Sequence, residues 1–438
     1  MERRITVSTQ YPSYWAFEGK PVLLLGGSVE DNLFQIPNTM EQLEQLHAVG
    51  GNYVRCTMSS RDPGDVWPFE RLSADGPYDL REPSREFWCR FSRFLALCYS
   101  MDIMVQLEVW ATFDYYRDNW AVNPFNPVNN VNYTPEQSRL PVVVDSHPVR
   151  AENPFFFSVP GALDNRVVLR HQRAFVDSLL AHSLLYPNVL YCMDNETNVT
   201  PLWGEYWSDY IRQQAAAQDV VVHTTEMWDA HDLGHDSHKA TLDHPETYSF
   251  CDVSQNNHQV GQAHWDNMQK ARAYVFERKI RPMNSVKIYG ADTGRYGTER
   301  DGIERFWRNI FGGLAAARFH RPASGIGLSE SAQTQIQSAR MLVDAVNVFA
   351  CQPHNDLLSE RAENEAYCMA QPGVEAAVVF MDGGQVVLDT SSMAGDLRVR
   401  WLDIANHTWL PAQTVPQTAQ LALEAPLQGM RAVVIQAA

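Results

Sequence analysis

Eight short apolar runs rich in β-branched residues alternate with helical patterns, and this alternation constrains the fold more than any other feature of the sequence. The runs cover residues 22–26, 52–58, 103–109, 189–193, 220–224, 249–254, 286–290 and 316–320. Buried parallel strands read as continuous apolar runs, and the strand and helix units repeat at roughly 30 residues apart from two longer intervals. Eight such units predict an α/β fold closed into a (β/α)8 TIM barrel.

The pattern changes after the last barrel helix, which we expect at 335–350. Apolar strand-like segments then follow at 376–380, 385–389, 397–404 and 432–435, and Gly383-Gly384 is one of the turn signals between them. We therefore predict a barrel domain over residues 1–355 and a small C-terminal all-β sandwich over 356–438. The sandwich is expected to support the barrel and to contribute no catalytic group.

Charge and composition exclude several classes of partner. The formal net charge is −17 and no lysine- or arginine-rich run occurs, so the chain is expected to bind no nucleic acid. No stretch approaches 18 uninterrupted apolar residues, which predicts no membrane span. The first residues lack the apolar segment of a signal peptide. We expect a cytoplasmic protein as given, or a secreted or periplasmic one if a leader was removed; no signal for an oligomeric state is present.

Polar side chains follow nearly every predicted strand, and catalytic groups of barrel enzymes stand at the C-terminal ends of strands. Any one of these residues could merely cap a helix, but so many together favour a functional site. We take nine of them as candidate substrate-binding residues: Arg55, Glu108, Trp110, Asn195, His223, Glu226, His258, His320 and Arg321. The long interval 111–165, rich in Pro, Asn and aromatic residues, is expected to lie over the same face.

Two carboxylates stand where glycosidic bond hydrolysis needs them. That reaction requires one protonated carboxyl group to assist the leaving oxygen and a second that attacks or activates water. Glu196 follows the fourth predicted strand and Asp292 follows the seventh. We take these two residues as the catalytic candidates, with Glu226 as the main competitor of Asp292.

Here the sequence resembles clan A of the glycoside hydrolases. Asn195-Glu196 resembles the Asn-Glu pair that carries the clan's acid/base, and Asp292 in Tyr289-Gly-Ala-Asp-Thr-Gly294 occupies the place of its strand-seven carboxylate. Arg55 resembles the arginine that supports the nucleophile, and His258 a polar strand-six residue near the site. The resemblance implies a retaining mechanism with Glu196 as acid/base and Asp292 as nucleophile.

The ends of the chain resemble a narrower group within that clan. Phe17-Glu-Gly-Lys-Pro-Val-Leu-Leu-Leu-Gly-Gly, Asn364-Glu-Ala-Tyr-Cys-Met-Ala-Gln-Pro-Gly-Val and Val399-Arg-Trp-Leu-Asp are similar to the apiosidase-like barrel family with its C-terminal collagen-binding sandwich. This resemblance implies hydrolysis of a plant or algal oligo- or polysaccharide. The clan's nucleophile is usually glutamate; an aspartate withdraws the carboxylate by about 1.5 Å, which leaves an inverting mechanism open.

Two other classes of function stay open on the sequence alone. Residues 223–238 are dense in His, Asp and Glu, which would suit a metal-dependent barrel hydrolase, but the first strand supplies no histidine pair. For that reason we expect no metal. We also expect no cofactor, because the sequence contains no nucleotide-binding glycine motif. The third class is a carbohydrate-binding barrel without turnover. We also expect Arg55, Arg321, His258 and His320 to make the pocket positive and to favour an anionic sugar.

Overall fold

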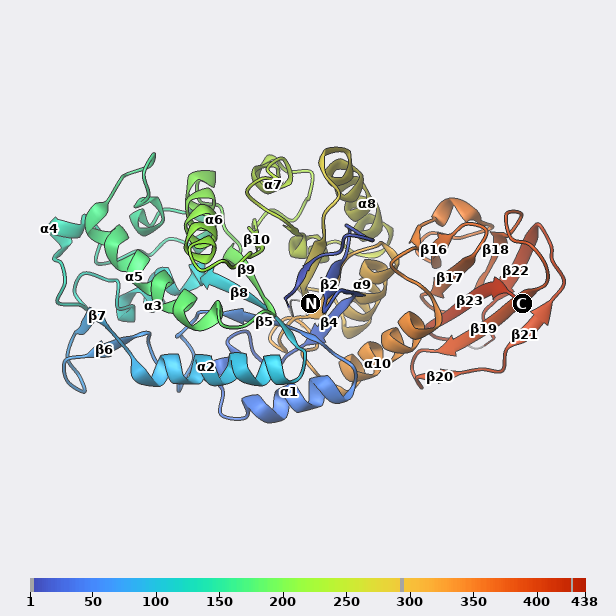
Figure 1. Ribbon diagram of the computed structural model, residues 1–438, viewed down its shortest axis with the longest axis horizontal. Helices are drawn as coiled ribbons and strands as arrows, with labels where there is room; N and C mark the ends of the chain where they lie inside the picture. Colours follow the sequence, from blue (N-terminus) through green and yellow to red (C-terminus); the bar gives the residue numbers. More distant parts are fainter. Residues whose placement is uncertain (1–3, 292–294, 427) are drawn as a thin grey trace.

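Eight parallel strands form a barrel in the computed structural model, which describes residues 4–291, 295–426 and 428–438 (Figure 1). The predicted (β/α)8 barrel is confirmed. Its strands are β4 (Leu24–Gly27), β5 (Tyr53–Thr57), β8 (Met104–Trp110), β9 (Val189–Asp194), β10 (Thr224–Thr225), β11 (Cys251–Asp252), β12 (Met283–Ile288) and β13 (Ala316–Phe319). The strands overlap or adjoin the eight apolar runs, with shifts of a few residues at their ends.

The strands are paired in the order β10-β9-β8-β5-β4-β13-β12-β11. Side-chain hydroxyl groups join the two ends of this order. The Thr225 hydroxyl accepts from the Asp252 backbone N–H at 3.1 Å, and the Ser249 hydroxyl accepts from the Thr224 N–H at 3.3 Å. Because β10 and β11 are only two residues long, these bonds take the place of a longer backbone ladder.

Helices surround the barrel and bury their apolar faces against it (Figure 1). In the longest ones apolar residues recur at helical spacing along the buried face, as Phe87, Phe91 and Phe94 do. Side-chain caps fix several helix starts, among them Ser84 and Asn165. The outer helices are α1 (Thr39–Ala48), α2 (Arg85–Ser100), α5 (Arg166–Ser183), α6 (Pro201–Ala216), α7 (Asp236–Leu242), α8 (Gly261–Arg278), α9 (Glu299–Phe311) and α10 (Glu330–Ala345).

A small antiparallel sheet closes the N-terminal end of the barrel. It consists of β1 (Thr6–Val7), β2 (Trp15–Phe17) and β3 (Lys20–Val22). The buried Trp15 indole donates to Asn284 Oδ1 at 2.9 Å, and Asn284 in turn donates to the Tyr53 hydroxyl at 3.0 Å. Gln106 bridges Tyr53 and Asp252 across the interior. The lower barrel is therefore filled by a bonded polar layer among the described residues.

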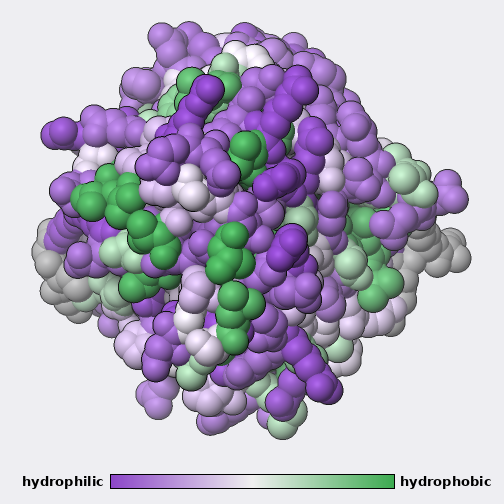
Figure 2. Space-filling model, turned by 90° about the vertical axis from the view of Figure 1, so that its left-hand side faces the viewer, coloured by the Kyte–Doolittle hydropathy of each residue, from purple (hydrophilic) through white to green (hydrophobic). Residues whose placement is uncertain are grey.

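The interval 111–165 is an ordered excursion rather than an open loop. It contains α3 (Arg117–Val122), α4 (Pro135–Ser138) and the 3-10 turns η2 (Thr112–Tyr115), η3 (Pro148–Arg150) and η4 (Pro154–Phe157). Asparagine amides bond its backbone carbonyls, as Asn126 does to Trp120 and Val142. Beside it lies the hairpin of β6 (Phe69–Arg71) and β7 (Tyr78–Pro83). Figure 2 shows this end of the molecule, where apolar side chains lie scattered among polar ones.

The C-terminal part is all-β, as predicted. One sheet contains β14 (Gln352–Pro353), β16 (Ala366–Gln371), β17 (Glu375–Phe380), β19 (Leu397–Asp403), β20 (Thr408–Trp409), β21 (Gln413–Val415) and β23 (Arg431–Ala437). A second sheet contains β15 (Leu358–Ser359), β18 (Gln385–Asp389) and β22 (Gln420–Glu424). Alternate residues such as Val378, Phe380 and Leu388 form a core of their own between the sheets.

The opposite face of the larger sheet packs on the barrel. Tyr367, Met369, Val379, Leu402 and Val434 belong to the same continuous apolar core as the barrel residues. A polar contact accompanies this packing: the Arg308 guanidinium of α9 donates to the Asn364 side chain at 2.8 Å. The β domain therefore forms a shared interior with the barrel.

Candidate active site

Glu196 stands at the C-terminal end of β9 on a strained turn. Its φ of 57° places it in the left-handed region, which costs a non-glycine residue of the order of 1 kcal/mol. The neighbours hold that conformation: Asn195 N–H donates to the Trp110 carbonyl at 3.2 Å and Thr197 N–H to the Met227 carbonyl at 2.9 Å. Such strain concentrates at functional sites, where surrounding contacts maintain it.

Three donors converge on one oxygen of the Glu196 carboxylate. Oε1 accepts from the Gln255 amide at 2.8 Å and from the Tyr289 hydroxyl at 2.7 Å, and the Lys287 ammonium lies 2.7 Å from the same atom. Among the residues that the structure describes, none is recorded bonding to Oε2, and the side chain is 15% exposed. The carboxylate is thus fixed through one oxygen, while the side chain as a whole stays partly exposed.

Lys287 reaches this position because β12 is irregular. Asn284 faces the interior, so strict alternation would place Lys287 on the outer face of the strand. The pairing of β12 with β13 shifts register between Ser285 and Ile288, which is typical of a β-bulge. The ammonium is consequently buried inside the barrel, where it also donates to the Asn195 side-chain oxygen.

The local charges keep Glu196 ionised. Burial alone would raise the pKa of its carboxyl group, but the Lys287 charge and the hydrogen bonds from Lys287, Tyr289 and Gln255 outweigh burial and lower that pKa below its ordinary value. Burial and the adjacent Glu196 charge raise the pKa of the Tyr289 phenol well above its ordinary value, so Tyr289 remains a donor.

Arg55 and Arg321 are occupied by carboxylates. The Arg55 guanidinium donates two hydrogen bonds, of 2.5 and 2.6 Å, to the Glu108 carboxylate and lies 2.6 Å from Asp31. All three side chains are buried. Arg321 contacts Glu30 at 2.6 Å and Asp31 at 3.3 Å. Despite burial, Arg55 and the other cations around it hold the pKa of Asp31 well below its ordinary value. This network is rigid, and its arginines are balanced by acids.

His258 and His320, two of the three candidate histidines, lie where burial disfavours the charged imidazole. Burial lowers the pKa of His320 well below its ordinary value, and burial with the neighbouring His231 lowers that of His258 to about 3. The expectation that Arg55, Arg321, His258 and His320 make the pocket positive is therefore wrong. The arginines are paired, and desolvation disfavours the charged imidazoles.

His258 instead forms part of a ring stack beside Glu196. Its ring lies 3.5 Å from that of His231 and 4.7 Å from that of Tyr289, and Tyr289 stacks on Tyr296 at 4.8 Å between centroids. His320 meets Tyr289 edge-on at 5.3 Å. Asn195, Glu196, His258 and His320 therefore come together around Tyr289, next to the Arg55 network.

Three predicted substrate-binding residues lie elsewhere. His223 precedes β10 rather than following it, and its ring contacts Trp15 at the closed end of the barrel. Trp110 is fully buried against rings such as Trp203 and Trp207 of α6, where it serves packing. Glu226 is 1% exposed and points toward α6, because a Cβ on Gly204 would lie 2.5 Å from its Oε2. These three assignments are corrected accordingly.

Glu226 and Asp194 form a buried acidic pair behind the site. Glu226 Oε1 accepts from the Asp194 and Met227 backbone N–H groups, each at 2.9 Å. Burial raises the pKa of both carboxyl groups well above their ordinary values, and the Asp194 charge adds to this effect at Glu226. The bond from the Asp194 N–H to Glu226 links β9 to the end of β10 beneath Glu196.

The sequence interpretation missed Lys287, Tyr289 and Gln255 as site residues. A lysine inside a strand run was a usable signal, since buried lysines are rare without a partner. Gln255 lies in η5 (Ser254–His258), just after β11, and carried no comparable signal. Asp292, the predicted nucleophile, lies outside the described residues.

The His-rich stretch does not gather around one point. The His238 ring bonds the Ala230 carbonyl at 2.8 Å, and the His235 ring caps the Ser237 N–H at the start of α7. Within residues 4–291, 295–426 and 428–438, no three His, Cys, Asp or Glu side chains are arranged to hold a metal ion. In that same part of the chain, every helix is too short or too polar to cross a bilayer.

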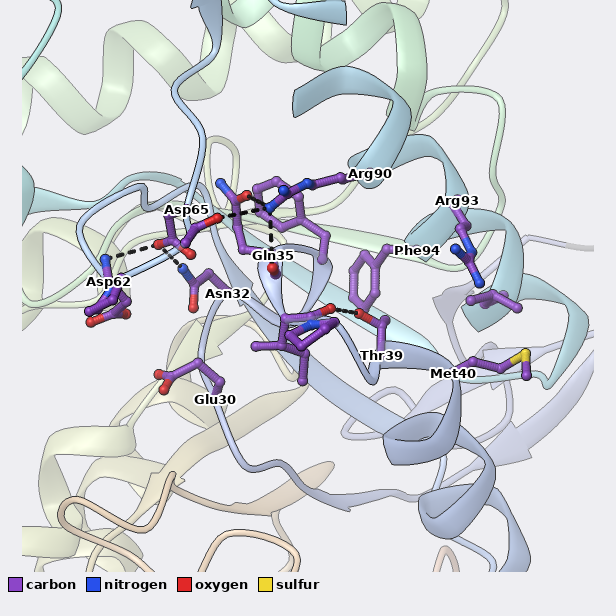
Figure 3. A pocket seen from close by; sticks show the side chains of 16 residues that line it. Glu30, Asn32, Gln35, Thr39, Met40, Asp62, Asp65, Arg90, Arg93 and Phe94 are labelled. Carbon is purple, nitrogen blue, oxygen red and sulfur yellow. Dashed lines mark hydrogen bonds between the residues drawn. The ribbon is translucent and has the colours of Figure 1, made fainter. Parts of the chain in front are cut away.

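A cavity of about 720 Å³ adjoins the site (Figure 3). It lies between α2, the start of α1 and residues 62–65, and Phe94 contributes to its apolar wall. Arg90, at its edge, donates to the Gln35 and Gly64 carbonyls. Glu30 and Asp62 border the cavity and lie 2.6 and 4.0 Å from Arg321. The cavity therefore adjoins the strand-eight end of the site but contains none of the Glu196 cluster.

No protein-family model matches the chain, and no curated protein matches it. Solved structures do share its fold at low identity. A glycoside hydrolase is 10% identical, with a TM-score of 0.66 over 99% of this chain and 97% of that one. A family 5 glycoside hydrolase from Bacteroides vulgatus ATCC 8482 is 11% identical, with a TM-score of 0.67 over 99% and 93%.

A third structure covers a smaller share of this chain. The endo-1,4-beta-mannanase from Rhizomucor miehei is 12% identical, with a TM-score of 0.55 over 78% of this chain and 100% of that one. At these identities the likeness shows a common (β/α)8 fold, and the first two structures extend it over almost the whole chain.

Proposed function

We propose that this protein is a glycoside hydrolase that acts at Glu196. The observation that carries the proposal is the Glu196 carboxylate at the C-terminal end of the fourth barrel strand, with a strained backbone, an ionised side chain, one oxygen fixed and the other free. The descriptions of the structural neighbours as glycoside hydrolases support it. The resemblance of the chain ends supports the narrower apiosidase-like assignment with a collagen-binding type of sandwich.

The contacts of Glu196 favour the role of nucleophile. A general acid must carry a proton, whereas three donors on Oε1 stabilise the carboxylate anion. In this assignment Oε2 attacks the anomeric carbon while the leaving oxygen receives a proton from an acid, and water then hydrolyses the glycosyl ester. The sequence-based assignment, with Glu196 as acid/base and Asp292 as nucleophile, is the alternative, and the two make opposite predictions for activated substrates.

The proposed substrate is a plant or algal oligo- or polysaccharide. The Tyr289 and His258 rings offer flat faces beside Glu196, and the bonded carboxylates and arginines around Asp31 offer acceptors and donors for hydroxyl groups. The cavity next to Arg321 has a volume in the range of ligand sites and would receive a further part of a longer chain.

A carbohydrate-binding barrel without turnover is the second candidate. It is favoured by one specific observation: β12 brings the Lys287 ammonium against Glu196 from the strand-seven side, the side from which a clan A enzyme would supply its second carboxylate. A binding protein would retain the rings and the fixed Glu196 but would lack a working acid.

The test is a screen of aryl glycosides, followed by plant and algal polysaccharides. Product release with a defined anomeric configuration, followed by NMR, is the expected result, and retention would fit a nucleophilic Glu196. Oligosaccharide binding by calorimetry without any release would overturn the enzymatic proposal and establish the binding protein instead.

A further inference from the structure

The cavity of about 720 Å³ is bordered by helices and loops rather than by barrel strands. One face of α2 forms a wall of it, with residues at helical spacing: Arg90, Arg93, Phe94 and Leu97 (Figure 3). The Arg90 guanidinium is occupied, because it donates to the Glu86 carboxylate at 2.6 Å and to two backbone carbonyls. The cavity therefore has a fixed wall on the flank of the barrel.

A series of contacts leads from this cavity to the active site. Glu30 borders the cavity and lies 2.6 Å from Arg321, which lies 3.3 Å from Asp31. Asp31 in turn lies 3.5 Å from His320, which belongs to the cluster around Glu196. Several side chains thus separate the cavity from Glu196, so a sugar unit bound in it is not the unit that is cleaved.

Two acceptor oxygens of the cavity lining have no partner. Asn32 is 1% exposed, and its amide donates to Asp65 Oδ2 at 2.7 Å. The Asn32 Oδ1 atom is buried and accepts no hydrogen bond from the residues that the structure describes. Asp65 Oδ2 also accepts from the Asp62 N–H at 3.0 Å, whereas Asp65 Oδ1 has no bond within the described part of the chain. Leaving a buried acceptor without a donor is costly, so this lining indicates a ligand that supplies donors.

The charged groups of the cavity are separated in space. Figure 3 shows Glu30, Asp62 and Asp65 toward one end and Arg93 toward the other. Three carboxylates at one end accept hydrogen bonds from hydroxyl groups and repel a negatively charged ligand. The Phe94 ring and the aliphatic side chains beside it offer an apolar surface to the C–H face of a sugar ring.

We propose that this cavity is a subsite for a neutral sugar unit of a longer substrate chain; this inference rests on the proposed function and names its substrate class. Hydroxyl groups of the unit donate to Asn32 Oδ1 and Asp65 Oδ1, and one face of its ring packs on Phe94. The carboxylates of Glu30 and Asp62 disfavour a uronate or a sulfated unit at the same place. The protein therefore selects chains that are neutral at this position.

The test is calorimetric binding of hexasaccharides to the whole protein. Mannohexaose, xylohexaose and galactohexaose are the neutral probes, and hexagalacturonate is the anionic one. We expect at least one neutral hexaose to bind, and to bind more tightly than hexagalacturonate. Asp65→Asn removes a charged acceptor and should weaken that binding about tenfold. Asp75→Asn, an exposed change in the turn between β6 and β7, is the matched control and should bind like wild type.

Turnover of substrates of two lengths is a second measurement. An aryl monoglycoside does not extend to the cavity, whereas a hexaose does. The fall in kcat/KM caused by Asp65→Asn should therefore be at least about fivefold larger for the hexaose, mainly through KM.

Three results would overturn the inference: wild-type binding of the hexaose by Asp65→Asn, tighter binding of hexagalacturonate than of every neutral hexaose, or binding of none of the probes. If Asp65→Asn does not fold, Asp62→Asn, at a partly exposed position of the same lining, is judged by the same criteria. A wild-type protein that binds a hexaose through Asp65 but hydrolyses no glycoside would instead contradict the proposed hydrolase function and leave the subsite in place.

Discussion

At the scale of single residues, the contacts of Glu196 decide its chemistry. A carboxylate whose one oxygen accepts from an ammonium, a phenol and an amide is stabilised as an anion. The strained left-handed backbone occurs at this same residue. Lys287 is the largest favourable contributor to the ionised state and is therefore the residue to change first.

Replacing Lys287 with glutamine should raise the pKa of Glu196, because burial remains while the opposing charge is removed. A nucleophile must be ionised, so the acid limb of kcat/KM should move to higher pH. We expect kcat/KM to fall at least about tenfold more at pH 5 than at pH 7, since one pKa unit is a tenfold change in ionisation. A pH profile on an aryl glycoside measures this.

The matched control is Lys279→Gln, which removes an exposed ammonium just after α8. Its profile should superimpose on that of wild type. An acid limb at the wild-type position in Lys287→Gln would show that Lys287 does not set the ionisation of Glu196.

How far the sequence predicts the site depends on local strand geometry. Glu196 and Asn195 were predictable because β9 ends where its apolar run ends. Lys287 carried a signal as a lysine within a strand run, but its inward direction was not predictable, because the bulge in β12 reverses the alternation of side chains. His223 was misassigned because β10 starts only at Thr224, the last residue of the apolar run that predicted the strand.

At the scale of elements, β9, β10 and α6 meet around the Asp194 and Glu226 pair. Gly204 lets α6 approach the Glu226 carboxylate, since a larger side chain would collide with Oε2. Both members of the pair are buried groups that titrate. Their contribution to the free energy of unfolding must therefore depend on pH.

Because burial raises both pKa values above those of the unfolded chain, the folded state binds more protons. The pair therefore stabilises most at low pH, and this contribution is lost as the pH rises from the unfolded pKa toward the folded one. Glu226→Gln removes one of these acids. The unfolding free energy of the variant minus that of wild type should therefore increase from pH 5 to pH 8. The limit is about 1.4 kcal/mol per pH unit for each proton.

Urea unfolding of both proteins across this pH range measures the effect. Glu277→Gln, at an exposed position of α8, is the control and should run parallel to wild type. A constant difference between Glu226→Gln and wild type at every pH would contradict a raised pKa for Glu226.

At the scale of the whole molecule, the β domain and the barrel form one packed unit. Tyr367 of β16 is fully buried, and its ring lies 4.6 Å from that of Trp265 on α8. The sequence predicted both the barrel and the all-β region from strand patterns. It did not predict their common core, because no local pattern reports contacts between segments about 100 residues apart.

Tyr367→Ala should destabilise both parts together. Truncating a large buried aromatic side chain costs about 3 to 5 kcal/mol, and a shared core predicts one calorimetric transition at a lower temperature. The matched control Tyr186→Ala removes a half-buried ring on the distant side of the barrel and should cost less. Two separate transitions in Tyr367→Ala, with that of the barrel unchanged, would show that the domains are independent.

The most direct test of the central claim is the activity of Glu196→Gln on a 2,4-dinitrophenyl glycoside that wild type hydrolyses. If Glu196 is the nucleophile, turnover should fall more than about a thousandfold, because an amide forms no glycosyl ester. A good leaving group removes the need for an acid but does not replace the nucleophile. Glu277→Gln should retain wild-type turnover. Near-normal hydrolysis of this activated substrate by Glu196→Gln, with loss only on alkyl glycosides, would contradict the account and make Glu196 the acid.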